Sequence, residues 1–121
     1  MAGRSARPQV PRRPYVVARA KIHWVALDPT VGTKIQKTRP CVVVSPDELN
    51  TRLDRVIIAP LTSAIRPFQF RVTTRVAGCP ASVVLDQLRT FDGARLGKRI
   101  GTVDARTMGD ILNTLQAMFA S

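Results

Sequence analysis

Short apolar runs alternate with turn residues along most of this chain, a pattern typical of a small antiparallel β protein. Runs rich in β-branched residues cover 22–27, 41–44, 56–61, 68–73 and 82–85, and a further short strand is expected over 99–103. Turn-forming residues separate these runs, as expected for strands joined by turns. The pattern therefore predicts a mainly-β fold, a small and strongly twisted antiparallel barrel.

Two helices are expected beside these strands. Ser45, Pro46 and Glu48 follow the second run in the order of a capping box, which predicts one helical turn there. Near the C terminus, Asp104 is placed to cap a longer amphipathic helix. Its apolar residues recur at three-, four- and seven-residue spacing: Met108, Ile111, Leu112, Leu115, Met118 and Phe119. This face is expected to pack on the barrel.

The length of 121 residues suffices for one domain. Residues 1–18 are basic and carry three prolines, so they are expected to form a disordered extension, with the barrel domain over 19–121. The extension is either a passive tail or an accessory arm that adds salt-sensitive contacts to phosphates. No apolar run follows its arginines and no segment is long enough to span a bilayer, so a cytoplasmic protein without membrane contact is expected.

The chain is strongly basic, with 19 Lys and Arg residues against 8 Asp and Glu residues and a formal net charge of +11. Arginine accounts for 15 of the 19 cations. A planar guanidinium binds phosphate oxygens through two parallel hydrogen bonds, which an ammonium group cannot do. The composition therefore predicts a polyanionic or acidic partner rather than a neutral metabolite.

Few residues suit metal or thiol chemistry. Cys41 and Cys79 are the only cysteines and His23 is the only histidine, and no zinc spacing, acidic cluster or nucleotide-binding loop is present. No metal or cofactor is expected. Strand alternation places His23 on the face opposite Ile22 and Trp24, which favours a surface or partner contact over catalysis. Trp24 is expected in the core, with a stacking platform as the alternative.

Polar side chains gather at strand ends. Arg39 precedes Pro40 at the start of the 41–44 run, and Pro40 restrains the backbone that carries the guanidinium. An arginine held in this way suits phosphate binding. Further polar residues follow the next apolar runs: Thr62 and Ser63 after 56–61, and Asp86, Gln87 and Arg89 after 82–85.

The order of these residues resembles that of the MazF/PemK toxin ribonucleases. The resemblance covers about residues 20–120 and rests on Trp24, Asp28-Pro29, Gly32, Arg39-Pro40, Thr62 and Asp86-Gln87. It implies an SH3-like barrel with a terminal helix. It also implies a homodimeric toxin that cuts single-stranded mRNA at specific sequences without a metal, leaves 2′,3′-cyclic phosphate and 5′-hydroxyl ends, halts translation, and is neutralised by an acidic antitoxin.

The resemblance also assigns roles to residues. Arg39 and Thr62 match the family's catalytic arginine and threonine, and RNA supplies its own nucleophile, the ribose 2′-hydroxyl. Arg39 is expected to neutralise the scissile phosphate, with its part in proton transfer left open, and Thr62 to donate a hydrogen bond to a nonbridging oxygen. The expected substrate-binding residues are Ser63, Gln87 and Arg89, together with Thr33, Lys34, Gln36 and Lys37 in a loop that would set sequence selectivity.

The sequence departs from the family pattern at two places. Ala20-Lys21 replaces the usual Gly-Asp, and Lys34 and Lys37 are basic where an acid or small residue is common, so the target sequence of the family cannot be assigned to this chain.

Two alternative functions stay open. They are a gyrase-poisoning toxin of the CcdB type and a noncatalytic nucleic-acid-binding barrel. In a purely structural role, Arg39 would pair with a carboxylate such as Asp86.

Overall fold

The computed structural model describes residues 17–27 and 38–120. Seven strands lie in this part of the chain: β1 (Lys21–Ala26), β2 (Thr38–Val43), β3 (Arg55–Thr62), β4 (Arg71–Val76), β5 (Cys79–Val84), β6 (Arg89–Asp92) and β7 (Leu96–Thr102). Two α-helices accompany them, α1 (Asp47–Leu53) and α2 (Ala105–Phe119), with the short 3₁₀ turns η2 (Leu85–Gln87) and η3 (Gly93–Arg95). The predicted class, a mainly-β barrel with a short helix after the second strand and a C-terminal helix, is confirmed.

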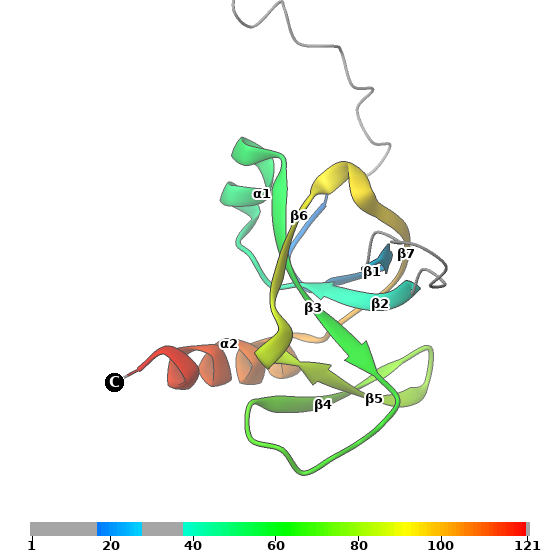
Figure 1. The fold of residues 1–121 in the computed structure, drawn as a ribbon, viewed down its shortest axis with the longest axis vertical. Helices are drawn as coiled ribbons and strands as arrows, with labels where there is room; N and C mark the ends of the chain where they lie inside the picture. Colours follow the sequence, from blue (N-terminus) through cyan, green and yellow to red (C-terminus); the bar gives the residue numbers. More distant parts are fainter. Residues whose placement is uncertain (1–16, 28–37, 121) are drawn as a thin grey trace, which may run out of the picture.

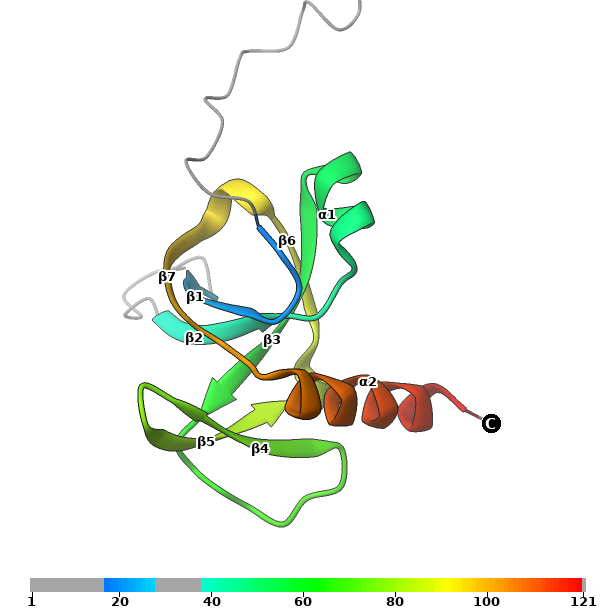
Figure 2. The ribbon, with the colours of Figure 1, turned by 180° about the vertical axis from the view of Figure 1, so that it is seen from behind.

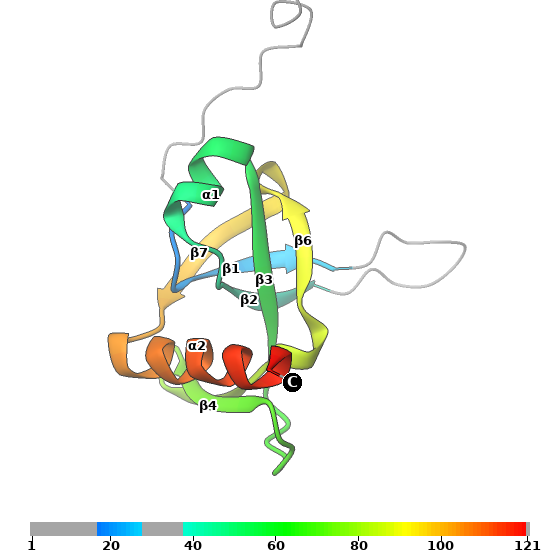
Figure 3. The same cartoon turned by 90° about the vertical axis from the view of Figure 1, so that its left-hand side faces the viewer.

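All strand pairs are antiparallel, in the order β4-β5-β3-β2-β1-β7, and β6 pairs with β3 off this path. The long strand β3 connects two parts of the curled sheet, since β2 and β6 pair with its two opposite edges and β5 pairs with its far end (Figures 1 and 3). Helix α1 and the β4–β5 hairpin lie at opposite ends of the molecule (Figure 1).

Both faces of the curled sheet are buried, because each face packs its own apolar cluster. The cluster inside the curl contains Val25, Val43, Val56, Ile58, Phe91 and Leu96. The cluster on the other face, covered by α2, contains Ile22, Val42, Leu61, Val83, Met108 and Ile111. Alternation along β1 and β2 therefore sends successive side chains into different cores rather than into a core and solvent.

This double burial corrects the prediction for His23, and the prediction for Trp24 was also wrong. His23 is fully buried rather than on the surface, and its Nδ1 lies 2.9 Å from the carbonyl oxygen of Gly97 on β7. Trp24 is 40% exposed rather than in the core. Trp24 pairs with Pro40 of β2. It lies two residues after Ile22, which is buried in the cluster that α2 covers. Helix α2, seen from behind in Figure 2, crosses the sheet near β4.

The capping-box prediction at Ser45 was wrong. Pro46 is the N-cap residue of α1 and makes no side-chain capping bond, and α1 has seven residues instead of one turn. Ser45 is buried, donates its hydroxyl proton to Asn50 Oδ1, and accepts a hydrogen bond from the Ile57 amide at 2.9 Å. The serine therefore ties α1 to β3 instead of capping the helix.

The prediction for the C-terminal helix is confirmed at its start. The Asp104 carboxylate accepts a hydrogen bond from the Thr107 amide at 2.7 Å, and Met108 and Ile111 are buried. Phe119 is 75% exposed, so its assignment to the packed face was wrong. It is the last residue of α2, and that end of the helix extends beyond the sheet (Figure 1).

Several strand boundaries differ from the predicted ones. Phe70 has a φ of 66°, which interrupts the extended backbone, so β4 begins at Arg71 instead of residue 68. Ala77 and Gly78, with φ values of 52° and 82°, form a two-residue turn between the paired residues Val76 and Cys79. Strand β5 therefore begins earlier than predicted, β7 begins at 96, and β6 was not predicted.

Candidate active-site cleft

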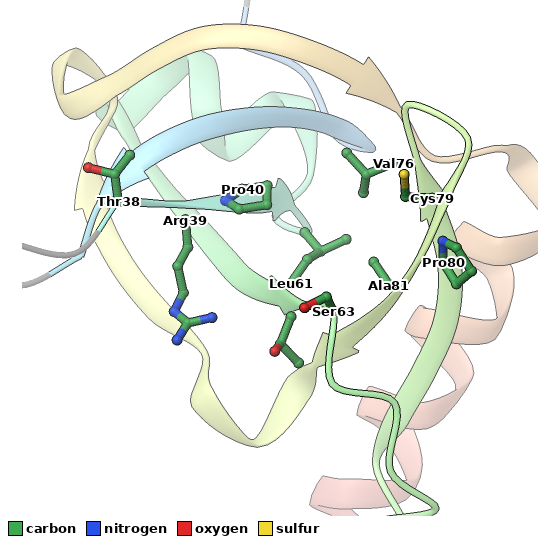
Figure 4. A pocket seen from close by; sticks show the side chains of 10 residues that line it. Thr38, Arg39, Pro40, Leu61, Ser63, Val76, Cys79, Pro80 and Ala81 are labelled. Atoms are coloured by element: carbon green, nitrogen blue, oxygen red, sulfur yellow. The ribbon is translucent and has the colours of Figure 1, made fainter.

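A cleft of about 390 Å³ opens where β2 begins and β3 ends. It is lined by residues 38–40 of β2, residues 61–63 at the end of β3, and residues 76 and 79–81 of the β4–β5 hairpin. Most of its wall is apolar. Figure 4 shows the Arg39 side chain leaving β2 on the side away from Thr38, while Val76, Cys79 and Pro80 form the opposite wall.

The antiparallel pairing of β2 and β3 brings Arg39 and Thr62 to the same end of these two strands. Cys41 pairs with Pro60, and Val43 pairs with Ile58 inside the curl. Arg39 and Thr62 each lie two residues beyond the Cys41–Pro60 pair, where Arg39 still pairs with Val25 of β1 and Thr62 pairs with Ser82 of β5. Both residues line the cleft. The structure thus brings together the two residues that the sequence singled out for catalysis.

Arg39 makes no ion pair within the described part of the chain. Asp86 pairs with Arg71 instead, with 3.6 Å between Oδ1 and Nε, and the Arg71 guanidinium also lies 4.8 Å from the centre of the Phe68 ring. The purely structural pairing of Arg39 with Asp86 is therefore absent among the described residues. No carboxylate in residues 17–27 and 38–120 therefore competes with an anion for the Arg39 guanidinium.

The hydroxyl of Thr62 is oriented by the backbone that follows it. Its Oγ1 accepts a hydrogen bond from the Ala64 amide at 3.2 Å. A hydroxyl has two acceptor positions and one donor proton. Because the amide occupies an acceptor position, the Thr62 proton can point to another acceptor, such as a phosphate oxygen.

Arg89 is a second arginine whose charge affects Cys41, the residue two positions after Arg39. Burial raises the pKa of the Cys41 thiol to about 12, while the positive charges of Arg39 and Arg89 oppose this rise. Both guanidinium groups are thus close enough to the buried thiol to affect it. Arg89 on β6 also lies 5.0 Å from the Phe91 ring. Cys41 stays protonated near neutral pH and is unsuited to act as a nucleophile.

The remaining predicted substrate-binding residues are placed in three ways. Ser63 lines the cleft. Gln87 is exposed at the end of η2, outside the lining of the cleft. The loop residues Thr33, Lys34, Gln36 and Lys37 lie outside the described residues, as does the N-terminal extension up to residue 16.

Sequence reasoning missed the wall formed by the β4–β5 hairpin. Val76, Cys79, Pro80 and Ala81 line the cleft, although they are distant from Arg39 in the sequence. The pair Ala77-Gly78 between two apolar runs was a signal for a two-residue hairpin turn. That signal predicts the hairpin itself, but it does not predict which strand the hairpin packs against.

Metal-binding clusters and membrane-spanning helices are both absent from the part of the chain that the structure describes. No three His, Cys, Asp or Glu side chains gather closely enough to bind a metal ion in the described ranges 17–27 and 38–120. Neither α1 nor α2 has the length and apolar character needed to cross a membrane.

Residues 18–119 match the sequence model of a family described as PemK-like, MazF-like toxin of type II toxin–antitoxin systems. The chain belongs to this family. Endoribonuclease PemK of Escherichia coli is 34% identical, covering 88% of this chain and 85% of that protein. Endoribonuclease MazF9 of Mycobacterium tuberculosis is also 34% identical, covering 84% and 94%. The resemblance to MazF/PemK toxins stated from the sequence is therefore confirmed.

Solved MazF structures share the fold of this PemK/MazF-like chain. MazF of Deinococcus radiodurans superposes with a TM-score of 0.71 at 24% identity, covering 86% of this chain and 96% of that one. A MazE–MazF structure from the same organism gives a TM-score of 0.75 at 23% identity with the same coverage. The likeness extends over nearly the whole MazF chain, so the curled sheet and its two helices are those of the toxin fold.

Proposed function

We propose that this protein is a toxin endoribonuclease that cleaves single-stranded mRNA at specific sequences and thereby inhibits translation. The observation that carries the proposal is that Arg39 and Thr62 line one cleft, in a chain of the PemK/MazF toxin family. The curated relatives PemK and MazF9 are both named endoribonucleases, which supports the same activity.

The proposed reaction uses the substrate's own nucleophile. The ribose 2′-oxygen gives its proton to solvent water and bonds to the adjacent phosphorus, the bond from phosphorus to the 5′-oxygen breaks, and the leaving 5′-oxygen takes up a proton from Arg39 or from water. The products are a 2′,3′-cyclic phosphate and a 5′-hydroxyl. The protein's task is to orient the phosphate and stabilise the negative charge that develops on its nonbridging oxygens.

Arg39 and Thr62 divide this task. The guanidinium stays protonated at neutral pH, so it neutralises the phosphorane and can pass a proton to the leaving oxygen. The Thr62 hydroxyl, oriented by the Ala64 amide, donates its proton to a nonbridging oxygen. These two donors require no metal ion, so the reaction is proposed to be metal-independent.

Further residues are proposed to bind the rest of the RNA. Ser63 lines the cleft, and the charge of Arg89 reaches the same strand end, so both suit phosphate contacts. Exposed Gln87 suits an unstacked base edge, which accepts and donates hydrogen bonds. The loop residues Thr33, Lys34, Gln36 and Lys37 are proposed to set sequence selectivity.

The proposed partners follow from charge and family. An acidic antitoxin would be attracted to this basic chain and would block Arg39 in the cleft, and the related MazF of Deinococcus radiodurans has been solved together with MazE. The protein is proposed to act as a homodimer in the cytoplasm. Residues 1–18 are proposed to be a basic extension of the domain over 19–121.

The test incubates wild-type protein and the Arg39→Ala and Thr62→Ala variants with a long single-stranded RNA in EDTA, and then maps the cut sites and end groups. Discrete cuts with cyclic phosphate and 5′-hydroxyl ends, lost in both variants, would support the proposal. Circular dichroism verifies that the variants fold. Absence of cleavage by folded wild-type protein across diverse RNAs would overturn it, and a supercoiling assay would then separate gyrase poisoning from simple binding.

A further inference from the structure

A second cleft, of about 370 Å³, adjoins the first on the other side of Pro80. It lies between β4, the end of β7 and the start of α2. The lining residues are Thr73, Thr74 and Arg75 of β4, Pro80 of β5, Thr102 of β7, and Asp104 and Thr107 at the start of α2. Because Pro80 lines both clefts, they are neighbours on the β4–β5 hairpin.

The second cleft differs from the first in chemistry. Its wall carries four threonine side chains, one guanidinium and one carboxylate, whereas the first is mostly apolar. Arg75 is exposed and makes no ion pair with any described acidic residue, and its Nη1 donates to the Gly78 carbonyl at 3.0 Å. That bond anchors the guanidinium on the hairpin turn and leaves its other N–H groups for a ligand.

Asp104 narrows the class of ligand. Its carboxylate accepts the Thr107 amide hydrogen bond at 2.7 Å, and hydrogen bonds from Thr107 lower its pKa, so it is ionised near neutral pH. A fixed negative charge opposes a phosphate deep in the cleft but accepts hydrogen bonds from hydroxyl or amino groups. Arg75 lies on the exposed hairpin, where a phosphate can meet it. The two charges together suit a ligand with an anionic backbone and a hydroxyl-bearing body, which describes a ribonucleotide.

We propose that the second cleft binds a nucleotide of the RNA that flanks the scissile step, with Arg75 on its phosphate and the threonine hydroxyls and Asp104 on its ribose and base edge. The inference rests on the proposed ribonuclease function and deepens it. Arg75 and Thr73 are binding residues for the flanking RNA, outside the catalytic pair. Their contribution depends on RNA long enough to reach them.

The test compares two RNAs that share one mapped cut site. The first is the shortest oligonucleotide that is cleaved, and the second carries several additional nucleotides on both sides. Wild-type protein is expected to have a lower KM for the extended RNA. Arg75→Gln and the isosteric Thr73→Val are each expected to raise this KM about three- to tenfold, the value of one or two lost hydrogen bonds. The kcat values and the KM of the short RNA should not change.

Arg52→Gln is the matched control, since Arg52 is an exposed arginine of α1, at the opposite end of the molecule from the β4–β5 hairpin (Figure 1). It should leave the ratio of the two KM values at the wild-type level. The inference is overturned if wild-type protein cleaves both RNAs with the same KM, or if Arg75→Gln affects both RNAs equally. Failure of wild-type protein to cleave any RNA would instead overturn the proposed function, and this inference with it.

Discussion

Arg39 on β2 and Thr62 on β3 line one cleft, and each lies two residues beyond the Cys41–Pro60 pair that ends the register of these antiparallel strands. The sheet holds the backbone of both residues in place, because Arg39 pairs with Val25 of β1 and Thr62 pairs with Ser82 of β5. Catalytic donors need this preorganisation, because donors that must reorient during the reaction lose much of their effect. Strand pairing within the sheet therefore accounts for the candidate site.

This relationship predicts that conservative changes at either position reduce cleavage. Arg39→Lys keeps the charge but loses the paired N–H donors, and Thr62→Val keeps the shape but loses the hydroxyl. Each is expected to lower kcat by about 10²-fold, the usual effect of removing one transition-state donor. Single-turnover cleavage of a mapped RNA measures the change. The controls are Arg52→Lys and Thr90→Val, two exposed residues outside the cleft, and an equal loss in the controls would contradict the assignment.

The β4–β5 turn predicts a stabilising substitution. Ala77 has a φ of 52°, a left-handed conformation that is unfavourable for alanine, and it precedes Gly78 in a two-residue hairpin. Ala77→Asn creates the Asn-Gly pair that such turns favour. The free energy of unfolding should rise by about 0.5–1 kcal/mol, measured by urea denaturation. Ala64→Asn, at an exposed position without positive φ, should give no increase.

The two thiols are expected to react very differently. Cys41 is buried with a pKa of about 12, whereas Cys79 is exposed at the wall of the cleft. Titration of the native protein with a thiol reagent at pH 8 should therefore modify one cysteine per chain, and titration in denaturant should modify both. A bulky maleimide on Cys79 should also block cleavage by filling the cleft. Cys79→Ser protein should keep its activity after the same treatment, and inhibition of that variant would contradict the prediction.

Acid should weaken the cap of α2. Hydrogen bonds from Thr107 lower the pKa of Asp104 in the folded state. A depressed carboxylate pKa means that the stabilisation is present above the unfolded value and is lost as pH falls through the folded value. The stability advantage of wild-type protein over Asp104→Ala should therefore be constant near neutral pH and shrink below about pH 4. Urea midpoints as a function of pH measure it, and Asp104→Asn, an uncharged cap, should show no such decline relative to Asp104→Ala.

The basic N-terminal extension gives a further prediction. Removal should end at residue 16, because Val17 is buried in the cluster inside the curl and its loss would destabilise the fold. If the extension is an accessory arm, the truncated protein should bind RNA more weakly and with a shallower dependence of affinity on salt. Fluorescence anisotropy between about 50 and 200 mM salt measures both. If the truncated protein has the same RNA affinity and the same salt dependence as the full chain, the extension is a passive tail.

The sequence by itself determined those features that depend on neighbouring residues. Alternating apolar runs fixed the mainly-β class, and the spacing from Asp104 to Ile111 fixed the capped helix α2, because backbone periodicity acts within a few residues. The same local logic placed Arg39 before a strand and Thr62 at the end of another. The family resemblance then joined these two residues into one predicted site.

Tertiary structure decided those features that depend on which strands lie next to each other. The sheet buries His23 beside β7 and leaves Trp24 on the opposite face of β1 40% exposed, so alternation alone misplaced both residues. The choice of Arg71 as the partner of Asp86, and the use of the β4–β5 hairpin as a wall of the cleft, also arise from contacts between segments distant in the chain. Such contacts are set by strand pairing and packing over the whole domain, and short-range patterns do not encode them.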